Sequence, residues 1–118
     1  MKTIRIGTRG SALAVVQTEM VQSALKEFYP DIQTQVCIIK TQGDILFDAP
    51  LDKIGGKGVF VKDIEKALLA ERIDIAVHSL KDMQACLPEG LIISAYLKRE
   101  NPQDMLFSKD NDTLATLP

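Results

Sequence analysis

Apolar and polar residues follow a pattern that predicts a short strand near the start of the chain and a long helix after it. β-Branched and polar residues alternate over 3–7 and stop at a glycine, which is typical of a strand that ends in a turn. Over 11–28 the apolar residues follow helical spacing, and Pro30 ends the pattern. We expect Ser11 to be the N-cap of this helix, because its hydroxyl can accept a hydrogen bond from a free backbone N–H.

The pattern continues with a second strand, a second helix and a third strand. Between the second strand and the second helix, residues 40–58 contain four glycines and one proline and show no periodicity. Two later apolar segments predict a fourth strand and a fifth. The ranges are 33–39 for the second strand, 60–68 for the second helix, and 73–77, 90–97 and 104–108 for the remaining strands.

The order of these elements predicts an α/β fold with a mostly parallel sheet flanked by helices. A β-α-β-α-β succession closes almost only with parallel strands and right-handed crossovers. Ligands bind at the carboxyl ends of the strands in such sheets. The first three strands end in the polar clusters TRGS (8–11), TQGD (41–44) and HSLKD (78–82). We therefore expect these clusters to meet at one edge of the sheet and to form a site.

Charge and composition limit what this site binds. The chain has 118 residues, with 14 Lys and Arg against 16 Asp and Glu and a net charge of -2. This balance argues against nucleic acid and anionic membranes as partners, so any anion site is local. No apolar signal segment and no apolar run of about 18 residues is found, and we expect a cytoplasmic protein. Cys37 and Cys86 stand outside any CxxC pattern, which predicts free thiols and no zinc site.

The first polar cluster brings Arg9 and Ser11 to the start of the first helix. Free backbone N–H groups and the positive end of the helix dipole favour an anion there, and the guanidinium of Arg9 matches a carboxylate or phosphate. The alternative is that Ser11 only caps the helix and Arg9 is solvated. We favour anion binding for Arg9 and expect Ser11 to cap the helix in either case.

Glycines surround Lys57 in the segment KIGGKGVF (53–60). Backbone amides there can approach an anion, but Leu51 and Gly58 break the Walker A spacing. Two interpretations stay open, a binding loop or lid and a flexible connector before the second helix.

The third cluster contains Asp82, the best catalytic candidate in the chain. A carboxylate stabilises a developing cation in a site that is otherwise rich in positive charge. The alternative is a surface ion pair between Lys81 and Asp82, which would contribute only ~0–1 kcal/mol. His78 is the sole histidine, so we expect a structural role for it and no histidine metal site.

Five segments, in this order and spacing, resemble the porphobilinogen deaminase family, also called hydroxymethylbilane synthase. They are IRIGTRGSALAVVQ, TQGD, GGKGVFVKDIEKALL, DIAVHSLKD and RENPQDMLFS. The resemblance covers essentially the whole chain and implies a transferase of tetrapyrrole (heme) biosynthesis. It implies that four units of the small molecule porphobilinogen are condensed into hydroxymethylbilane, with release of ammonia, on a covalently held dipyrromethane primer.

The resemblance also implies residue roles. Asp82 matches the family's catalytic aspartate, Phe60 would abut the ring-binding region, and Ser79 would line the same cofactor-binding cleft. The carboxylates of cofactor and substrate would be held by Arg9, Ser11, Lys53, Lys57 and Lys81. Gly10 and Gln84 depart from the family, which often has glutamine and proline there. We expect the first departure to affect the turn that carries Arg9 and the second to affect the loop after Asp82.

The family has three domains, and the resemblance implies that residues 1–118 form the first, similar to one lobe of the type II periplasmic-binding-protein fold. The second and third domains, with the cysteine that anchors the primer, would be absent, so we expect the chain alone to be inactive. The family is typically monomeric, but an unpaired sheet edge in the isolated chain invites self-association.

A competing interpretation is a non-catalytic α/β module that binds anions or carboxylates. It accounts for Arg9, Lys57 and Lys81 but not for Asp82, because a carboxylate repels anions.

Overall fold

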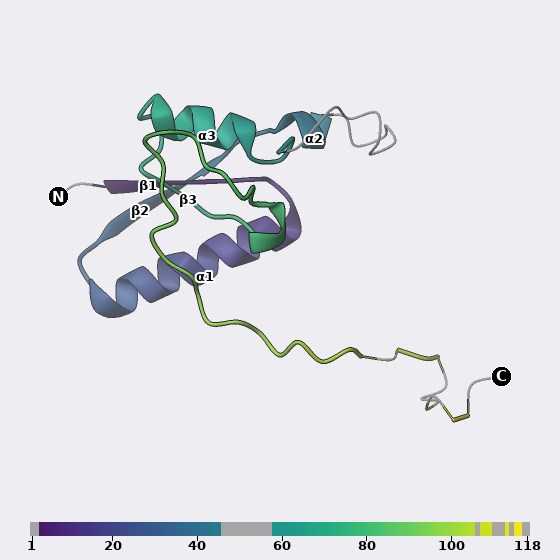
Figure 1. Ribbon diagram of the computed structural model, residues 1–118. Helices are drawn as coiled ribbons and strands as arrows, with labels where there is room; N and C mark the ends of the chain where they lie inside the picture. Colours follow the sequence, from purple (N-terminus) through teal and green to yellow (C-terminus); the bar gives the residue numbers. More distant parts are fainter. Residues whose placement is uncertain (1–2, 46–57, 106, 110–112, 114, 117–118) are drawn as a thin grey trace.

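A three-stranded parallel sheet forms the centre of the protein. The computed structural model describes residues 3–45, 58–105, 107–109, 113 and 115–116, and its strand order is β2-β1-β3. β1 covers Thr3–Thr8, β2 covers Gln33–Ile38 and β3 covers Ile75–Ala76, and both outer strands run parallel to β1. The predicted parallel sheet is confirmed, with β1 at its centre (Figure 1).

An ion pair holds the short strand β3 against β1. β3 pairs with β1 only at Ile6 and Gly7. Just before β3, the carboxylate of Asp74 accepts hydrogen bonds from the backbone N–H of Arg5 at 2.8 Å and from its Nη2 at 2.9 Å. The backbone N–H of Asp74 in turn donates to the carbonyl of Arg5 at 2.9 Å. The position of β3 therefore rests on these contacts as well as on its own ladder.

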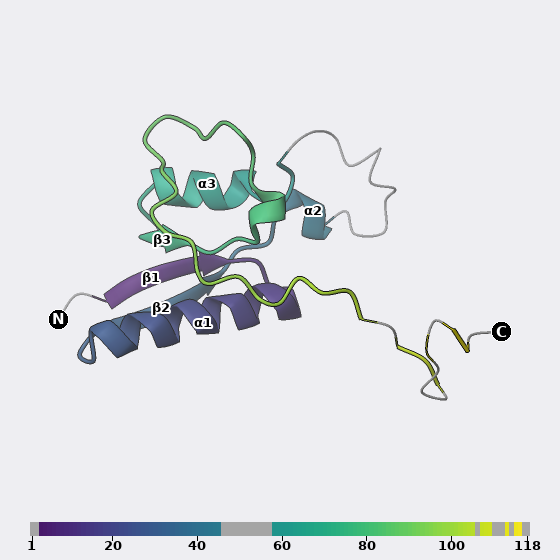
Figure 2. The same ribbon diagram turned by 60° about the horizontal axis from the view of Figure 1, so that its bottom comes forward.

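Helices cover both faces of the sheet, which confirms the flanked arrangement. α1 (Ala12–Phe28) lies on one face and α3 (Lys62–Leu69) on the other, as Figures 1 and 2 both show. Two short helices, α2 (Gln42–Ile45) and η1 (Leu80–Asp82), were not predicted by the apolar pattern. Within the described residues, none of the helices combines the length and the apolar character needed to cross a membrane.

The buried apolar core lies on the α3 side of the sheet. Ile64, Ala67 and Ile73 form its centre, and Cys37 packs against it as a small apolar residue of a strand. On the other face, the apolar residues of α1 are less well covered, because Leu13 is 55% exposed and several others are at least 40% exposed. The two faces of the sheet are therefore packed to different degrees.

The predicted fourth strand over 90–97 is wrong. This segment forms no ladder, and Ile92 is 84% exposed. The described residues of 104–108 form no strand either, and the third strand is limited to 75–76 rather than 73–77. A strand-like sequence becomes a strand only where a neighbour pairs with its backbone. In the described part of the chain no strand pairs with this segment, which runs past the sheet toward α1 before the chain extends away (Figure 1).

Candidate functional site

The carboxyl ends of the three strands meet at one edge of the sheet. Arg9 follows β1, Asp44 lies in α2 shortly after β2, and His78 follows β3. Arg9 forms an ion pair with Asp44, and the positive charge of Arg9 lowers the pKa of His78. The three polar clusters therefore come together, as the parallel order of the strands predicted.

Ser11 is the N-cap of α1. Its backbone is extended, and its hydroxyl accepts a hydrogen bond from the backbone N–H of Ala14 at 3.3 Å. The predicted cap is confirmed, and this geometry uses one acceptor position of the Ser11 hydroxyl.

Arg9 binds a carboxylate of its own chain. Its Nη2 donates to Oδ1 of Asp44 at 2.6 Å, and its Nε donates to the same oxygen at 3.1 Å. The guanidinium carbon lies 4.0 Å from the centre of the Phe60 ring, which is close enough for a cation–π interaction. The side chains of Arg9 and Asp44 are only 20% and 24% exposed. The alternative that Arg9 is solvated is therefore wrong, and one edge of its guanidinium is occupied.

Thr41, at the start of the turn that contains Asp44, holds the Asp44 carboxylate. Its Oδ2 accepts hydrogen bonds from Oγ1 of Thr41 at 2.7 Å and from the backbone N–H of Thr41 at 3.1 Å. Burial raises the pKa of the Asp44 carboxyl, but the hydrogen bonds from Arg9 and Thr41 outweigh it and hold the pKa below its ordinary value. Asp44 therefore stays ionised beside Arg9.

Sequence reasoning missed the role of Asp44. The cluster TQGD was recognised as a polar strand end, but none of its residues was assigned to the site. The signal was present, because a threonine followed three residues later by an acidic residue is typical of a helix start. The partner of the aspartate could not be found from spacing, since Arg9 lies 35 residues away in the chain.

The ring of Phe60 contacts both Arg9 and the backbone of α2, and the ring-binding role that the resemblance implied for Phe60 stays a prediction. A Cβ atom on Gly43 would overlap the Phe60 ring, so the ring sits directly against the backbone of α2. A glycine at 43 is therefore what allows Phe60 to approach this part of the chain.

His78 is half-buried between two charges of opposite sign. Burial lowers its pKa below the ordinary value of 6.5, the positive charge of Arg9 lowers it further, and the negative charge of Asp82 opposes both. The charges of Arg9, after β1, and Asp82, after β3, therefore both act on the imidazole of His78.

η1 follows directly after Ser79 and carries both Lys81 and Asp82. The backbone N–H of Asp82 donates to the carbonyl of Ser79 at 3.0 Å, which closes the turn. The hydroxyl of Ser79 donates to Oε1 of Gln17 on α1 at 2.9 Å. Ser79 therefore ties the end of β3 to the first turns of α1.

Lys81 and Asp82 line one cavity of about 470 Å³. Its other lining residues are Gly58, Met83, Gln84, Ala85 and Cys86. Neither Lys81 nor Asp82 forms an ion pair in the part of the chain that the structure describes, so the alternative of a Lys81–Asp82 surface pair is wrong. The two opposite charges are thus both available to a ligand in the same cavity.

Gln84 packs against Gly58 at the edge of this cavity. Gly58 has a φ of +82°, and a Cβ atom there would also overlap the Gln84 side chain. The side chain of Gln84, the residue that departs from the family, therefore contacts the glycine-rich segment at Gly58. Lys53 and Lys57, the other predicted ligands of that segment, lie outside the described residues.

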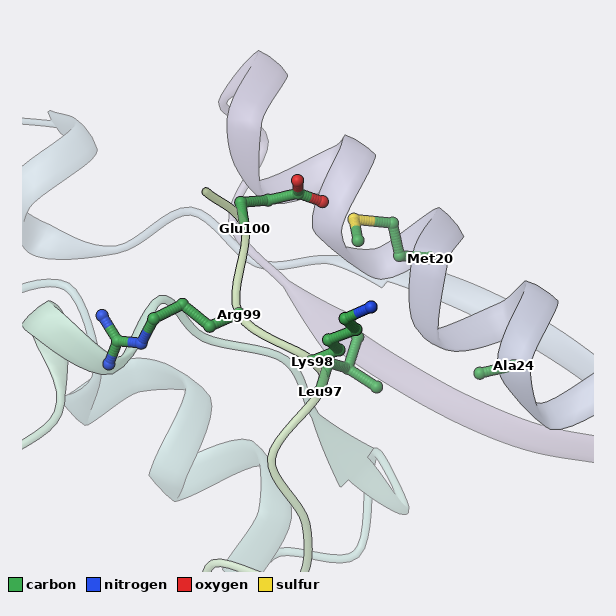
Figure 3. A pocket seen from close by; sticks show the side chains of 6 residues that line it. All are labelled: Met20, Ala24, Leu97, Lys98, Arg99 and Glu100. Atoms are coloured by element: carbon green, nitrogen blue, oxygen red, sulfur yellow. The ribbon is translucent and has the colours of Figure 1, made fainter. Parts of the chain in front are cut away.

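A second cavity, of about 360 Å³, lies away from this edge, between α1 and the segment after residue 96. Figure 3 shows that the side chains of Arg99 and Glu100 extend in opposite directions from the chain, with Met20 and Ala24 on the α1 side. None of the predicted site residues lines it.

Comparisons with known proteins agree on one family. The family model described as porphobilinogen deaminase, dipyromethane cofactor binding domain, matches residues 4–118. A porphobilinogen deaminase of Alkaliphilus metalliredigens is 50% identical over 118 residues, which is all of this chain and 37% of the relative. Relatives of the same name from Syntrophomonas wolfei and Syntrophus aciditrophicus are 52% identical over 118 residues and 55% identical over 105, covering 39% and 34% of their lengths. The chain thus spans little more than a third of the curated relatives that it matches.

Proposed function

This chain belongs to the porphobilinogen deaminase family, and on that premise we propose that it supplies one wall of the site where a whole protein joins porphobilinogen units into hydroxymethylbilane. The observation that carries the proposal is the cavity shared by Lys81 and Asp82, two opposite charges with no ion pair in the described part of the chain. A site for a molecule that is both anionic and transiently cationic needs both kinds of charge.

The chemistry of porphobilinogen matches these groups. The molecule carries an acetate and a propionate on a pyrrole ring, together with an aminomethyl group. The ammonium of Lys81 is suited to a carboxylate, and the remaining guanidinium edge of Arg9, at Nη1, has no hydrogen bond within the described residues. The ring of Phe60 offers an apolar surface beside that edge.

Each elongation breaks one C–N bond and forms one C–C bond. The amino group, protonated to an ammonium, leaves as ammonia with the bonding electron pair, and the ring that remains carries a positive charge. The free α-carbon of a neighbouring pyrrole then bonds to the methylene carbon, and its α-hydrogen leaves as a proton. We assign to Asp82 the stabilisation of the positive rings before and after this bond forms, by accepting a hydrogen bond from a pyrrole N–H.

The residues of this site fit dipyrromethane by their chemistry. The two-ring cofactor carries carboxylate side chains, and Arg9 and Lys81 are the cations at hand, with Phe60 as the adjacent aromatic surface. When bound, dipyrromethane supplies the free pyrrole α-carbon from which the chain of rings grows. Ser11 and Ser79 would contribute hydroxyls, and Lys53 and Lys57 would complete the set of cations.

A non-catalytic carboxylate-binding module is the second candidate, because the same cations would hold any small carboxylate. Asp82 separates the two functions. A negative charge in the binding cavity weakens the binding of anions, whereas it stabilises the cationic rings of the condensation.

The test is turnover by a chimera in which this chain replaces the aligned segment of the Alkaliphilus metalliredigens relative. We expect uroporphyrin absorbance after acid oxidation of the product, and a fall in kcat of about 100-fold or more for Asp82→Ala at unchanged Tm. Asp104→Ala, which removes an exposed aspartate outside the cavity, is the matched control and should leave kcat unchanged. A folded Asp82→Ala chimera with near-parental turnover would favour the module.

Two further expectations are part of this proposal. We propose that residues 1–118 act as one domain of the longer proteins of this family and that the protein works in the cytoplasm.

β2 and β3 are the outer strands of the sheet in the described residues, and self-association through such an edge stays a prediction.

A further inference from the structure

The guanidinium of Arg9 is held on two sides by its own chain. Asp44 accepts hydrogen bonds from Nη2 at 2.6 Å and from Nε at 3.1 Å, which occupies one edge. Phe60 lies against one face, 4.0 Å from the guanidinium carbon. A free arginine side chain samples many rotamers, and ordering it on binding weakens affinity. Here contacts within the chain restrict the side chain before any ligand binds.

The carboxylate of Asp44 is also held by contacts other than those with Arg9. Both the hydroxyl and the backbone N–H of Thr41 donate to its Oδ2, while Oδ1 receives the two short bonds from Arg9. Oδ1 therefore accepts the two shorter hydrogen bonds from Arg9, while Oδ2 accepts from Thr41 and, at 3.4 Å, also from Nε of Arg9. A carboxylate anchored in this way defines the direction of its partner.

We propose that Asp44 is a positioning residue, which holds Arg9 side-on so that the Nη1 edge is presented to a carboxylate of porphobilinogen or of a pyrrole chain built from it. This inference rests on the proposed function, because it takes Arg9 as a ligand of those carboxylates. Asp44 acts through Arg9 and does not touch the reacting atoms.

A carboxylate beside Arg9 has two opposite effects on anion binding. Its negative charge reduces the attraction of Arg9 for a second carboxylate, so its loss would tighten binding if charge alone mattered. Its hydrogen bonds orient the guanidinium, so its loss would weaken binding if orientation dominates. The two effects predict changes of opposite sign.

Two variants at the same position separate these effects. Asp44→Asn and Asp44→Ala both remove the negative charge, but only asparagine keeps an oxygen that accepts from Arg9. We expect Asp44→Ala to bind porphobilinogen about tenfold more weakly than Asp44→Asn, by isothermal titration calorimetry on the chimera. We expect Asp44→Asn to bind at least as tightly as the parent.

A double-mutant cycle shows whether Asp44 acts through Arg9. In an Arg9→Ala background, Asp44→Ala should no longer weaken binding, because there is no guanidinium left to orient and only the loss of the negative charge remains. The NMR signal of the Arg9 Nε–H gives a readout without ligand, and it should lose its protection from exchange in Asp44→Ala and keep it in Asp44→Asn.

Asp63→Ala is the control for the stability of α2. Asp63 accepts a hydrogen bond from the backbone N–H of Gln42 at 3.0 Å, so it supports the same helix without contacting Arg9. We expect it to leave porphobilinogen affinity unchanged once Tm shows that the protein is folded.

The outcomes distinguish this inference from the function on which it rests. If the parent chimera binds no porphobilinogen, the proposed function fails and the inference fails with it. If the parent binds but Asp44→Ala binds as tightly as Asp44→Asn, Asp44 does not position Arg9 and only the inference is overturned. If Asp63→Ala reproduces the loss, the effect belongs to α2 as a whole, which also overturns it.

Discussion

Gly43 lies so close to the ring of Phe60 that a Cβ atom between them would overlap the ring carbons. The same ring faces the guanidinium of Arg9, and the residue after Gly43 is Asp44, which binds that guanidinium. Two consecutive residues of α2 therefore determine both contacts of Arg9, one by having no side chain and the other by its carboxylate.

Gly43→Ala should destabilise the fold. Alanine is the better residue for a helix, so propensity alone would favour the variant. The ring of Phe60 must move to make room, and such overpacking typically costs about 1–3 kcal/mol. The free energy of unfolding in urea measures the effect.

Gly10→Ala is the control for this substitution. A Cβ atom at Gly10 would lie 3.1 Å from Cγ2 of Ile38, a tight contact with the end of one side chain rather than with a ring. We expect a clearly smaller loss than for Gly43→Ala. Equal losses in the two variants would mean that Phe60 is not held against Gly43.

The titration of His78 should report the charges at the edge of the sheet. As the sole histidine it gives an unambiguous imidazole signal in NMR, and we expect a pKa below 6.5. Asp82→Asn should lower this pKa further, because it removes the opposing negative charge. Arg9→Gln should raise it, because it removes a positive one. Glu27→Gln, at the far end of α1, is the control, and a shift there as large as in Asp82→Asn would contradict the arrangement.

The lowered pKa of His78 also predicts how stability changes with pH. The unfolded chain takes up a proton at a higher pH than the folded one, so this residue makes the free energy of unfolding fall as pH drops from neutral through 6.5 toward the folded pKa. His78→Gln should remove that part of the slope. Urea unfolding across this range checks it, and an unchanged slope in the variant would show that His78 titrates normally.

Asp44 should contribute to stability in a more acidic window. Its pKa is lowered in the folded protein, so its contribution is fully present above the ordinary value of 3.8 and is lost as pH falls through the folded pKa. Asp44→Asn should therefore reduce Tm at neutral pH and have less effect in strong acid. Asp104→Asn is the control, and a loss for Asp44→Asn that persists undiminished in acid would rule out the charge as its cause.

The chain by itself should show no sustained conversion of porphobilinogen. Hydroxymethylbilane and its precursors carry a row of carboxylates, and the cations on one wall neutralise only part of them. Incubation with porphobilinogen, followed by acid oxidation and measurement of uroporphyrin absorbance, tests this expectation. Sustained turnover would contradict it.

Local patterns in the sequence determined most of the architecture and the family. Helical spacing over 11–28, strand alternation over 3–7 and the strand-like segment 33–39 depend on neighbouring residues, and the structure confirms all three elements. The β-α-β-α-β order required parallel strands, so it also placed the polar strand ends at one edge. The similarity of five motifs identified the family, which the comparisons confirm.

Only the tertiary structure decided which residues meet at that edge and which strands form. Arg9 and Asp44 are 35 residues apart, and no local pattern shows that the aspartate would form an ion pair with the arginine. The segment 90–97 has the composition of a strand but forms none in the described structure, because a strand also needs a partner for its backbone hydrogen bonds. Periodicity shows what a segment can become, whereas pairing and charge contacts depend on which distant residues the fold brings beside it.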